Sequence, residues 1–475
     1  MAHFHPSMED DDAQHSAKNQ IFSISETKTQ IRLALPLIIT NVSLFLIPMI
    51  SVMFAGRNNT LHLAGATLAY SWAYVSGFTF LMGLSCALDT LCGQAFGAFQ
   101  HRRLGLYLQS SCIISSSFSI VISAIWFFSE PILLSLKQDP QISRNASLFL
   151  KYLIPGVIAY GFVQNIMRFL QAQSIVLHLM IIAIISVAFH VALCSIMVKF
   201  SGLGFVAAPL AASVSFWFAA SALMVFVKMS GKLKDTWCGI SCDCLKYVVT
   251  TLKLALPSAG MVCLEGLAFD ILVILAGLMP NSQRTTSVMA ICVNTAAVAY
   301  MTSFGFSAVA STRVSNEIGA NNPTQAKRAV ITTVSFAILC SLTIDITLIF
   351  AHNWWSGLFT TSNEIKKTFA SLTPLLIASI TLDSVQGVLI GVVRGCGWQA
   401  IAFCTNILTF YFVGISVAVV LAFVKKLYVK GLWIGLLCGL FSQVCVLILL
   451  SLFLKWEKRK VEICSKNEVQ MNATK

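Results

Sequence analysis

Twelve long apolar runs constrain this chain more than any other feature of its sequence. A helix needs ~20 mainly apolar residues to cross the hydrocarbon core of a bilayer. Only 11% of the residues are charged, whereas a soluble chain carries about a quarter. The sequence therefore predicts an all-α membrane protein with twelve transmembrane helices. The runs lie near residues 31–55, 65–92, 104–129, 146–170, 175–199, 202–227, 250–277, 286–311, 328–351, 368–391, 398–423 and 431–454.

The first and seventh runs are two copies of one helix. Residues 33–56 and 254–277 both begin with Leu-Ala-Leu-Pro and end with Ala-Gly. Because six runs, an even number, separate the paired motifs, the two halves enter the membrane in the same orientation. This predicts an N-lobe at residues 31–227 and a C-lobe at residues 250–454, related by a parallel pseudo-two-fold axis along the membrane normal. Further paired motifs are Gly97-Ala98 with Gly319-Ala320, Val163-Gln164 with Val385-Gln386, and Gly202-Leu203 with Gly431-Leu432.

Lys and Arg in the connections predict the orientation of the chain. The linker at 228–249 and the tail at 455–475 are basic, and both lie on the same side as the polar segment 1–30. We expect all three to be cytosolic, the N-terminal segment to be disordered, and the home membrane to be the plasma membrane or the vacuolar membrane. The net charge is +13, but the basic residues are scattered singly between the apolar runs and form no basic stripe. No nucleic-acid partner is therefore expected.

Carboxylates in the middle of the apolar runs are the main functional signal. Glu265 and Asp270 lie in the seventh run, where the first copy has Leu44 and Met49, and Asp383 lies in the tenth run. An acid at a helix centre costs ~2.5–3.5 kcal/mol on insertion, so it faces a cavity or a partner. No Lys or Arg lies near Glu265 or Asp383 in its run. We therefore expect these two acids to bind protons in competition with a cationic or hydrogen-bonding substrate.

Other residues in the spans complete the predicted site and its moving parts. The expected coupling ion is H⁺, and no other cofactor and no metal site are expected. Cys238, Cys242 and Cys244 in the linker lack a His or a second Cys pair to form a zinc site.

Gln386 follows Asp383 at i+3. Candidates for lining the substrate cavity are Asn294, Gln386, Tyr300, Asn406 and Asp270, and an interhelical hydrogen bond is the alternative for the uncharged ones. Candidates for hinges are Pro48, Pro257, Gly260 and Gly266.

Several ionisable residues receive a structural interpretation. Asp89 and Asp345 lie toward the ends of their runs, and we expect them to reach interfacial water. Arg168 and Arg394 fall at helix ends. His178 and His190 have no carboxylate or metal-spaced partner, so they are interpreted as satisfied core residues rather than parts of an intramembrane enzyme.

Three long strings carry a resemblance to a known family: ALDTLCGQAFGA at 87–98, STRVSNEIG at 311–319 and RGCGWQ at 394–399. With the duplication, they resemble the plant DETOXIFICATION branch of the multidrug and toxic compound extrusion (MATE) family. The resemblance implies a V of two six-helix lobes around a central cavity, a monomer, and proton-driven antiport of amphiphilic organic compounds such as xenobiotics, secondary metabolites and organic cations. It also implies that Glu265 and Asp383 are the coupling acids.

Two departures from the family pattern accompany this resemblance. Some prokaryotic relatives have an aspartate on the first helix, where this chain has Asn41 and no acid. Many plant relatives have paired tryptophans after the glutamate, where this chain has Gly266 and Leu267, which implies a roomier and less aromatic pocket.

The predicted function is proton-coupled export of small organic substrates across a lipid membrane. An alternative is Na⁺ coupling on the same scaffold, because carboxylates with nearby carbonyl and amide oxygens also suit a hard cation. A second alternative is a flippase for lipid-linked precursors, which would need several basic residues in its cavity to bind a diphosphate.

Overall fold

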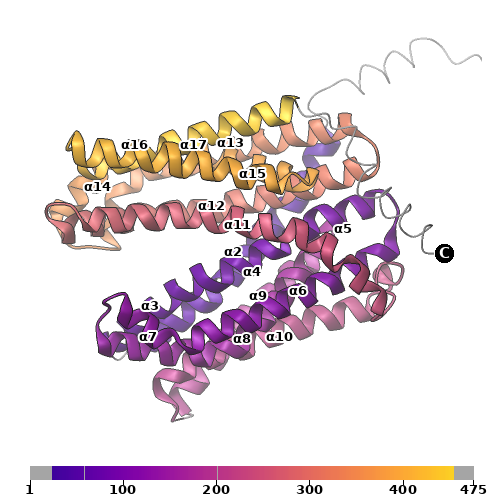
Figure 1. The fold of residues 1–475 in the computed structure, drawn as a ribbon, viewed down its shortest axis with the longest axis horizontal. Coiled ribbons are helices and arrows are strands. Elements are labelled where there is room, and N and C mark those ends of the chain that lie inside the picture. Colours follow the sequence, from indigo (N-terminus) through magenta and orange to yellow (C-terminus); the bar gives the residue numbers. More distant parts are fainter. Residues whose placement is uncertain (1–23, 58, 201, 454–475) are drawn as a thin grey trace, which may run out of the picture.

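The computed structural model describes residues 24–57, 59–200 and 202–453, and the described chain is helical (Figure 1). Twelve of its helices are long and apolar enough to cross a membrane. They form two bundles of six that lie side by side, with the first half of the chain in one bundle and the second half in the other (Figure 1). The predicted fold class is confirmed. Residues 1–23 of the segment predicted to be disordered (1–30) and the basic tail at 455–475 lie outside the described residues.

The first lobe holds spans one to six. Its second span is continuous but changes helical type, with a π-helical turn at Tyr74–Phe78. The helices are α2 (Ile24–Gly56), then α3 (Thr60–Ala73), η1 (Tyr74–Phe78), α4 (Thr79–Ser85) and α5 (Ala87–Gly97) as the second span, then α6 (His101–Phe127), α7 (Ser129–Ser135), α8 (Pro140–Ala172), α9 (Val176–Phe200), η2 (Gly204–Val206) and α10 (Ala207–Met229).

The second lobe holds spans seven to twelve, after two short turns in the linker. Its eleventh span contains two π-helical stretches. The elements are η3 (Gly231–Leu233) and η4 (Cys242–Cys244), then α11 (Leu245–Gly277), α12 (Ser282–Gly319), α13 (Pro323–Gly357), α14 (Asn363–Cys396), α15 (Gln399–Asn406), η5 (Ile407–Ile415), α16 (Ser416–Val419), η6 (Val420–Val424) and α17 (Tyr428–Phe453).

Local chemistry explains where several of these helices begin and end. Oδ1 of Asn59 accepts a hydrogen bond from the Leu61 N–H at the start of α3, and Asp139 does the same for the first turn of α8, where Pro140 is the first helical residue. Both arrangements satisfy N–H groups that have no partner within the helix. At the other end of a span, Gly397 adopts a left-handed conformation that stops α14.

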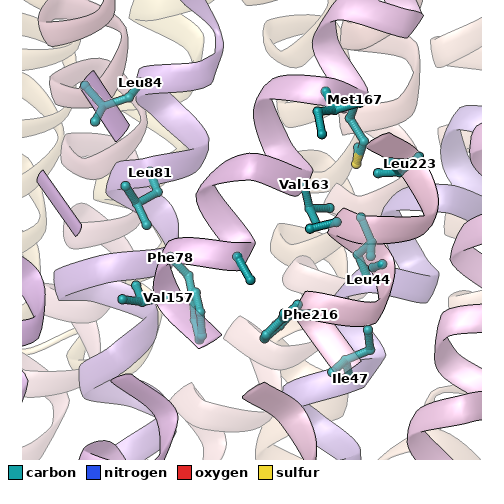
Figure 2. Close-up of a cluster of buried hydrophobic side chains, with 14 of the residues drawn as sticks. Leu44, Ile47, Phe78, Leu81, Leu84, Val157, Val163, Met167, Phe216 and Leu223 are labelled. Carbon is teal, nitrogen blue, oxygen red and sulfur yellow. The ribbon is translucent and has the colours of Figure 1, made fainter. Parts of the chain in front are cut away.

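Each lobe has its own apolar core, and its outer face is apolar as well. Figure 2 shows the core of the first lobe, where Leu44 of α2, Leu81 of α4, Val163 of α8 and Phe216 of α10 are among the buried side chains that meet. Large apolar residues such as Phe350 are exposed on the outside. An apolar exterior is expected where lipid replaces water as the solvent.

Two sequence-based boundaries need correction. The helix α2 begins at Ile24, so residues 24–30, which were expected to be disordered, are helical. Gln30 is buried there and donates a hydrogen bond to the Ala329 carbonyl. Pro257 lies well inside α11, which begins at Leu245 and not near residue 250. Both helices begin in amphipathic segments before their apolar runs. A count of apolar residues does not detect such extensions.

Candidate functional site

A cavity of about 160 Å³ lies where the second span of the first lobe faces the second lobe. The first-lobe wall is short and comes from η1 and α4. Most of the wall comes from α11 and α12, and one side chain comes from α14. The lining residues are Tyr74, Val75, Thr79, Met82, Val262, Cys263, Glu265, Gly266, Leu267, Phe269, Asp270, Val293, Ala296, Ala297, Tyr300 and Asp383.

Two buried carboxylates face this cavity from different helices. Glu265 of α11 and Asp383 of α14 are each 8% exposed. Oδ1 of Asp383 is buried and has no hydrogen-bond partner among the described residues. The cavity lining, taken over the described chain, includes no Lys or Arg. Because a buried negative charge without a partner is costly, the ionised Asp383 needs a proton or a cationic ligand, and Glu265 faces the same cavity.

The space beside Glu265 is open. A Cβ atom added at Gly266 would meet no atom within 4 Å. Gly266 and Leu267 both line the cavity, which agrees with the roomier pocket expected from the sequence. Gly260, earlier on α11, differs, because a Cβ there would lie 2.5 Å from the Phe403 ring of α15. Gly260 therefore serves close helix packing, a role that the hinge interpretation missed.

The candidate lining residues separate into two groups. Asp270 and Tyr300 line the cavity with the two acids. Asn294 is exposed on α12 and does not line it. Asn406 is fully buried, donates to the Met261 carbonyl at 2.9 Å and accepts from Gln443 at 2.7 Å. Asn406 thus ties α15 to α11 and α17, which is the alternative that the sequence left open.

Gln386 takes part in a second, smaller cavity. This space of about 10 Å³ is lined by Glu265, Gln386, Ser307 and Arg394, among others. Ser307 donates to the Gly387 carbonyl, which holds α12 against α14. Glu265 therefore borders two spaces, one shared with Asp383 and one shared with a buried guanidinium.

The wall on the side of the first lobe is aromatic. A neighbouring cavity of about 60 Å³ shares Tyr74, Met82 and Tyr300 with the larger one. Its lining also includes Asn41 and Pro48, and no Asp, Glu, Lys or Arg of the described chain. The first lobe thus offers apolar and aromatic surface, and the ionisable groups come from the second lobe.

A buried ion-pair network connects the lobes and was not predicted. Asp89 of α5, Arg168 of α8 and Arg394 of α14 have side chains that are each 1% exposed. Oδ1 of Asp89 lies 3.6 Å from Nη1 of Arg168, and its Oδ2 lies 3.7 Å from Nε of Arg394. The expectation that Asp89 reaches water is therefore wrong. Arg168 and Arg394 do lie near the ends of α8 and α14, as expected, but both are buried there and pair with Asp89. The sequence did contain a signal for this network, since one acid and two arginines lie in or near apolar runs, where buried charges are expected to pair with one another.

Hydrogen bonds reinforce this contact at the end of the molecule where α5 and α8 end. Thr90 donates to the Arg394 carbonyl, Gln94 donates to the Gly395 carbonyl at 3.0 Å, and Gln171 donates to the Ala308 carbonyl at 3.1 Å. A Cβ at Gly97 would collide with the backbone of Asn316. The two lobes are therefore closed against each other at this end.

Two further buried polar residues have hydrogen-bond partners on neighbouring helices. His190 contacts the hydroxyls of Ser51 and Ser215 at 3.1 and 2.9 Å, as expected for a core histidine. Asp345, which was expected at the interface, is 2% exposed and accepts a 2.6 Å hydrogen bond from Thr381. Its partner lies on α14, so Asp345 ties α13 to that helix.

Comparison with known sequences gives matches across both lobes. The MatE family matches residues 36–196 and 257–420. Protein DETOXIFICATION 18 of Arabidopsis thaliana is 51% identical over 439 residues, covering 92% of this chain and 94% of that protein. Protein DETOXIFICATION 16 of the same plant is 42% identical over 433 residues, covering 91% of this chain and 89% of that protein.

Comparison with solved structures gives the same architecture. The crystal structure of the eukaryotic MATE transporter AtDTX14 is similar with a TM-score of 0.88 and 34% identity, covering 92% of this chain and 98% of that one. An outward-facing conformation of a multidrug resistance MATE family transporter of the MOP superfamily has a TM-score of 0.80 and 17% identity, covering 90% and 95%. The second similarity concerns the fold alone.

Proposed function

The chain belongs to the plant DETOXIFICATION branch of the MATE family, which consists of multidrug and detoxification efflux transporters, and we propose that it couples export to proton uptake. In this proposal Glu265 is the principal proton acceptor. Asp383 is the partner carboxylate that contacts a cationic substrate. The exported compounds are amphiphilic organic molecules, including xenobiotics, secondary metabolites and organic cations.

One observation carries the proposal: Glu265 and Asp383 are buried in the wall of one cavity whose described lining contains no cation. A proton and a cationic substrate can each neutralise these carboxylates. One site cannot hold both at full occupancy, so binding of one favours release of the other. Protons that enter from the acidic side would therefore displace substrate toward that side.

The surface around the acids supports an amphiphilic substrate. Tyr74 and Tyr300 line both neighbouring cavities. The smaller of the two is also lined by Phe45, Tyr70, Phe78, Tyr160 and Phe304. Aromatic faces bind apolar groups and also attract organic cations. The site therefore offers apolar contact on one side and negative charge on the other.

The cycle requires that the lobes open and close around this site. The lobes are closed at the end that holds Asp89 and Arg394, which the distribution of Lys and Arg predicts to be cytosolic. Arg394 shares a small cavity with Glu265. A change of charge on Glu265 therefore alters the electrostatic field at the ion pair that joins the lobes, which offers a route from proton binding to opening.

The decisive experiment is transport in proteoliposomes under an imposed pH gradient in Na⁺-free buffer, screened across organic cations and flavonoid-like anions. Proton-driven exchange of organic compounds supports the proposal. Activity that requires Na⁺ and ignores the pH gradient would instead support Na⁺ coupling at the same carboxylates. Exchange of lipid-linked diphosphates alone would favour a flippase, for which the acidic cavity is chemically unsuited.

A further inference from the structure

A further cavity of about 520 Å³, which shares no lining residue with the cavities around the carboxylates, lies at the closed end of the first lobe. It forms where the turn between α5 and α6 meets the start of α11. We propose that this basic pocket binds the phosphate of an anionic lipid headgroup. The residues that carry the inference are His101, Arg102, Arg103, Asp243 and Lys246, which all line it.

The charge of the pocket favours an anion. Arg102, Arg103 and Lys246 are three cations, and Asp243 is the one carboxylate in the described lining. Asp243 accepts a 2.9 Å hydrogen bond from Lys246 and lies 3.6 Å from Arg102. The carboxylate therefore holds two cations near the cavity while the pocket keeps a net positive charge. Phosphate oxygens are strong acceptors for guanidinium and ammonium groups.

The donors in the pocket are not all used within the protein. Nη1 of Arg103 and Nδ1 of His101 are buried atoms without a hydrogen-bond partner among the described residues. Both belong to the first turn of α6, which contains no acidic residue and no side-chain capping hydrogen bond. The positive end of a helix adds to the attraction for an anion. Two residues with unpartnered buried nitrogens and the basic first turn of α6 thus line one cavity.

The apolar edge of the pocket indicates that the anion belongs to a lipid. Phe99 lines the pocket, is 81% exposed and has a left-handed backbone conformation, which is uncommon for a residue other than glycine. Leu106 and Tyr247 also line it. The pocket lies at the start of α6, a helix long and apolar enough to cross a membrane, and the ends of such helices meet the headgroup region. The distribution of Lys and Arg predicts that this end is cytosolic, and the cytosolic leaflet carries the anionic lipids.

The test measures lipid retention by the purified full-length protein with native mass spectrometry, using phosphatidic acid and phosphatidylcholine as probes. The test variant is Arg102→Gln/Arg103→Gln. The matched control is Lys232→Gln/Lys327→Gln. It removes two exposed cations that lie outside the pocket, in connections at the same end of the molecule. We expect phosphatidic acid to bind the wild type and the control alike, and the test variant about thirtyfold more weakly, from ~1 kcal/mol for each cation.

Three outcomes would overturn the proposal. The first is equal retention of phosphatidic acid by the test and control variants. The second is equal retention of phosphatidylcholine and phosphatidic acid by the wild type. The third is displacement of the lipid by an equal concentration of inorganic phosphate, which would make soluble phosphate the ligand. If the double variant does not fold, Lys246→Gln, whose side chain is 69% exposed, replaces it, with about fivefold weaker binding expected. This proposal is independent of the coupling ion, because the assay measures no transport.

Discussion

Asp89 in the first lobe and Arg394 in the second form a buried ion pair, with Oδ2 and Nε 3.7 Å apart and both side chains 1% exposed. Arg394 also donates to Cys86 at 3.1 Å and to Ser307 at 2.5 Å. One guanidinium thus binds a carboxylate and a thiol of the first lobe and a hydroxyl of the second. This pair closes one end of the molecule, and its Arg394 lines the small cavity that Glu265 also lines.

Loss of the Asp89 carboxylate should weaken this closure. In Asp89→Asn, Arg168 and Arg394 remain buried without their shared counter-ion, and breaking a buried pair in this way costs about 3–5 kcal/mol. We expect a lower unfolding temperature and slower exchange. Thermal unfolding of the purified protein, measured beside Asp243→Asn as the control with a partly exposed carboxylate, checks this. Equal unfolding temperatures for the wild type and Asp89→Asn would contradict the assigned role.

Glu265→Gln should abolish proton-driven exchange and leave folding intact. Glutamine keeps the volume and the hydrogen bonds of the side chain but cannot take up and release a proton. The measurement is substrate exchange in proteoliposomes under a pH gradient, with size-exclusion chromatography as the check on folding. Glu364→Gln is the control, because the Glu364 side chain is 72% exposed and does not line the cavity. Wild-type exchange by Glu265→Gln would refute the assignment.

Asp383→Asn should impair exchange, and Asp345→Asn should not. Both carboxylates are buried, but only Asp383 lines the cavity with Glu265. Asp345 instead accepts a hydrogen bond from Thr381, which asparagine can still accept. Exchange rates and affinity for an organic cation, measured for both variants, separate a role in the cavity from general sensitivity to the loss of a buried acid. Asn41→Ala, in the acid-free wall of the first lobe, should also have the smaller effect.

Gly266→Trp should narrow the range of substrates. A side chain at this position enters open space beside Glu265, since an added Cβ meets nothing within 4 Å. Bulky compounds should lose affinity by more than small ones, as measured by competition against one labelled substrate. Gly260→Ala provides the contrast, because its Cβ would collide with Phe403 and should lower stability instead. Unchanged competition by large compounds in Gly266→Trp would show that this space is not part of the substrate path.

Much of the architecture followed from the sequence because lipid imposes a simple length rule. Each apolar run had to form a helix that satisfies its own backbone hydrogen bonds, so the twelve spans and their two-fold repetition were visible in one chain. The same rule singled out Glu265 and Asp383, since an acid in mid-span is costly unless it serves a cavity. These inferences need only the position of a residue along its own helix.

Contacts between helices required the folded structure. Whether Asp89 reaches water or meets Arg394 depends on how α5 and α14 are rotated and how closely the lobes approach. In the same way, Asn406 faces Gln443 and Met261 while Asn294 is exposed, although both are single amides in apolar spans. A helix that contacts lipid on one side and protein on the other is apolar all round, so its sequence has little hydrophobic periodicity. The sequence therefore does not tell whether a polar side chain faces lipid or a neighbouring helix. Packing between helices sets that orientation, and with it the partners of the buried charges.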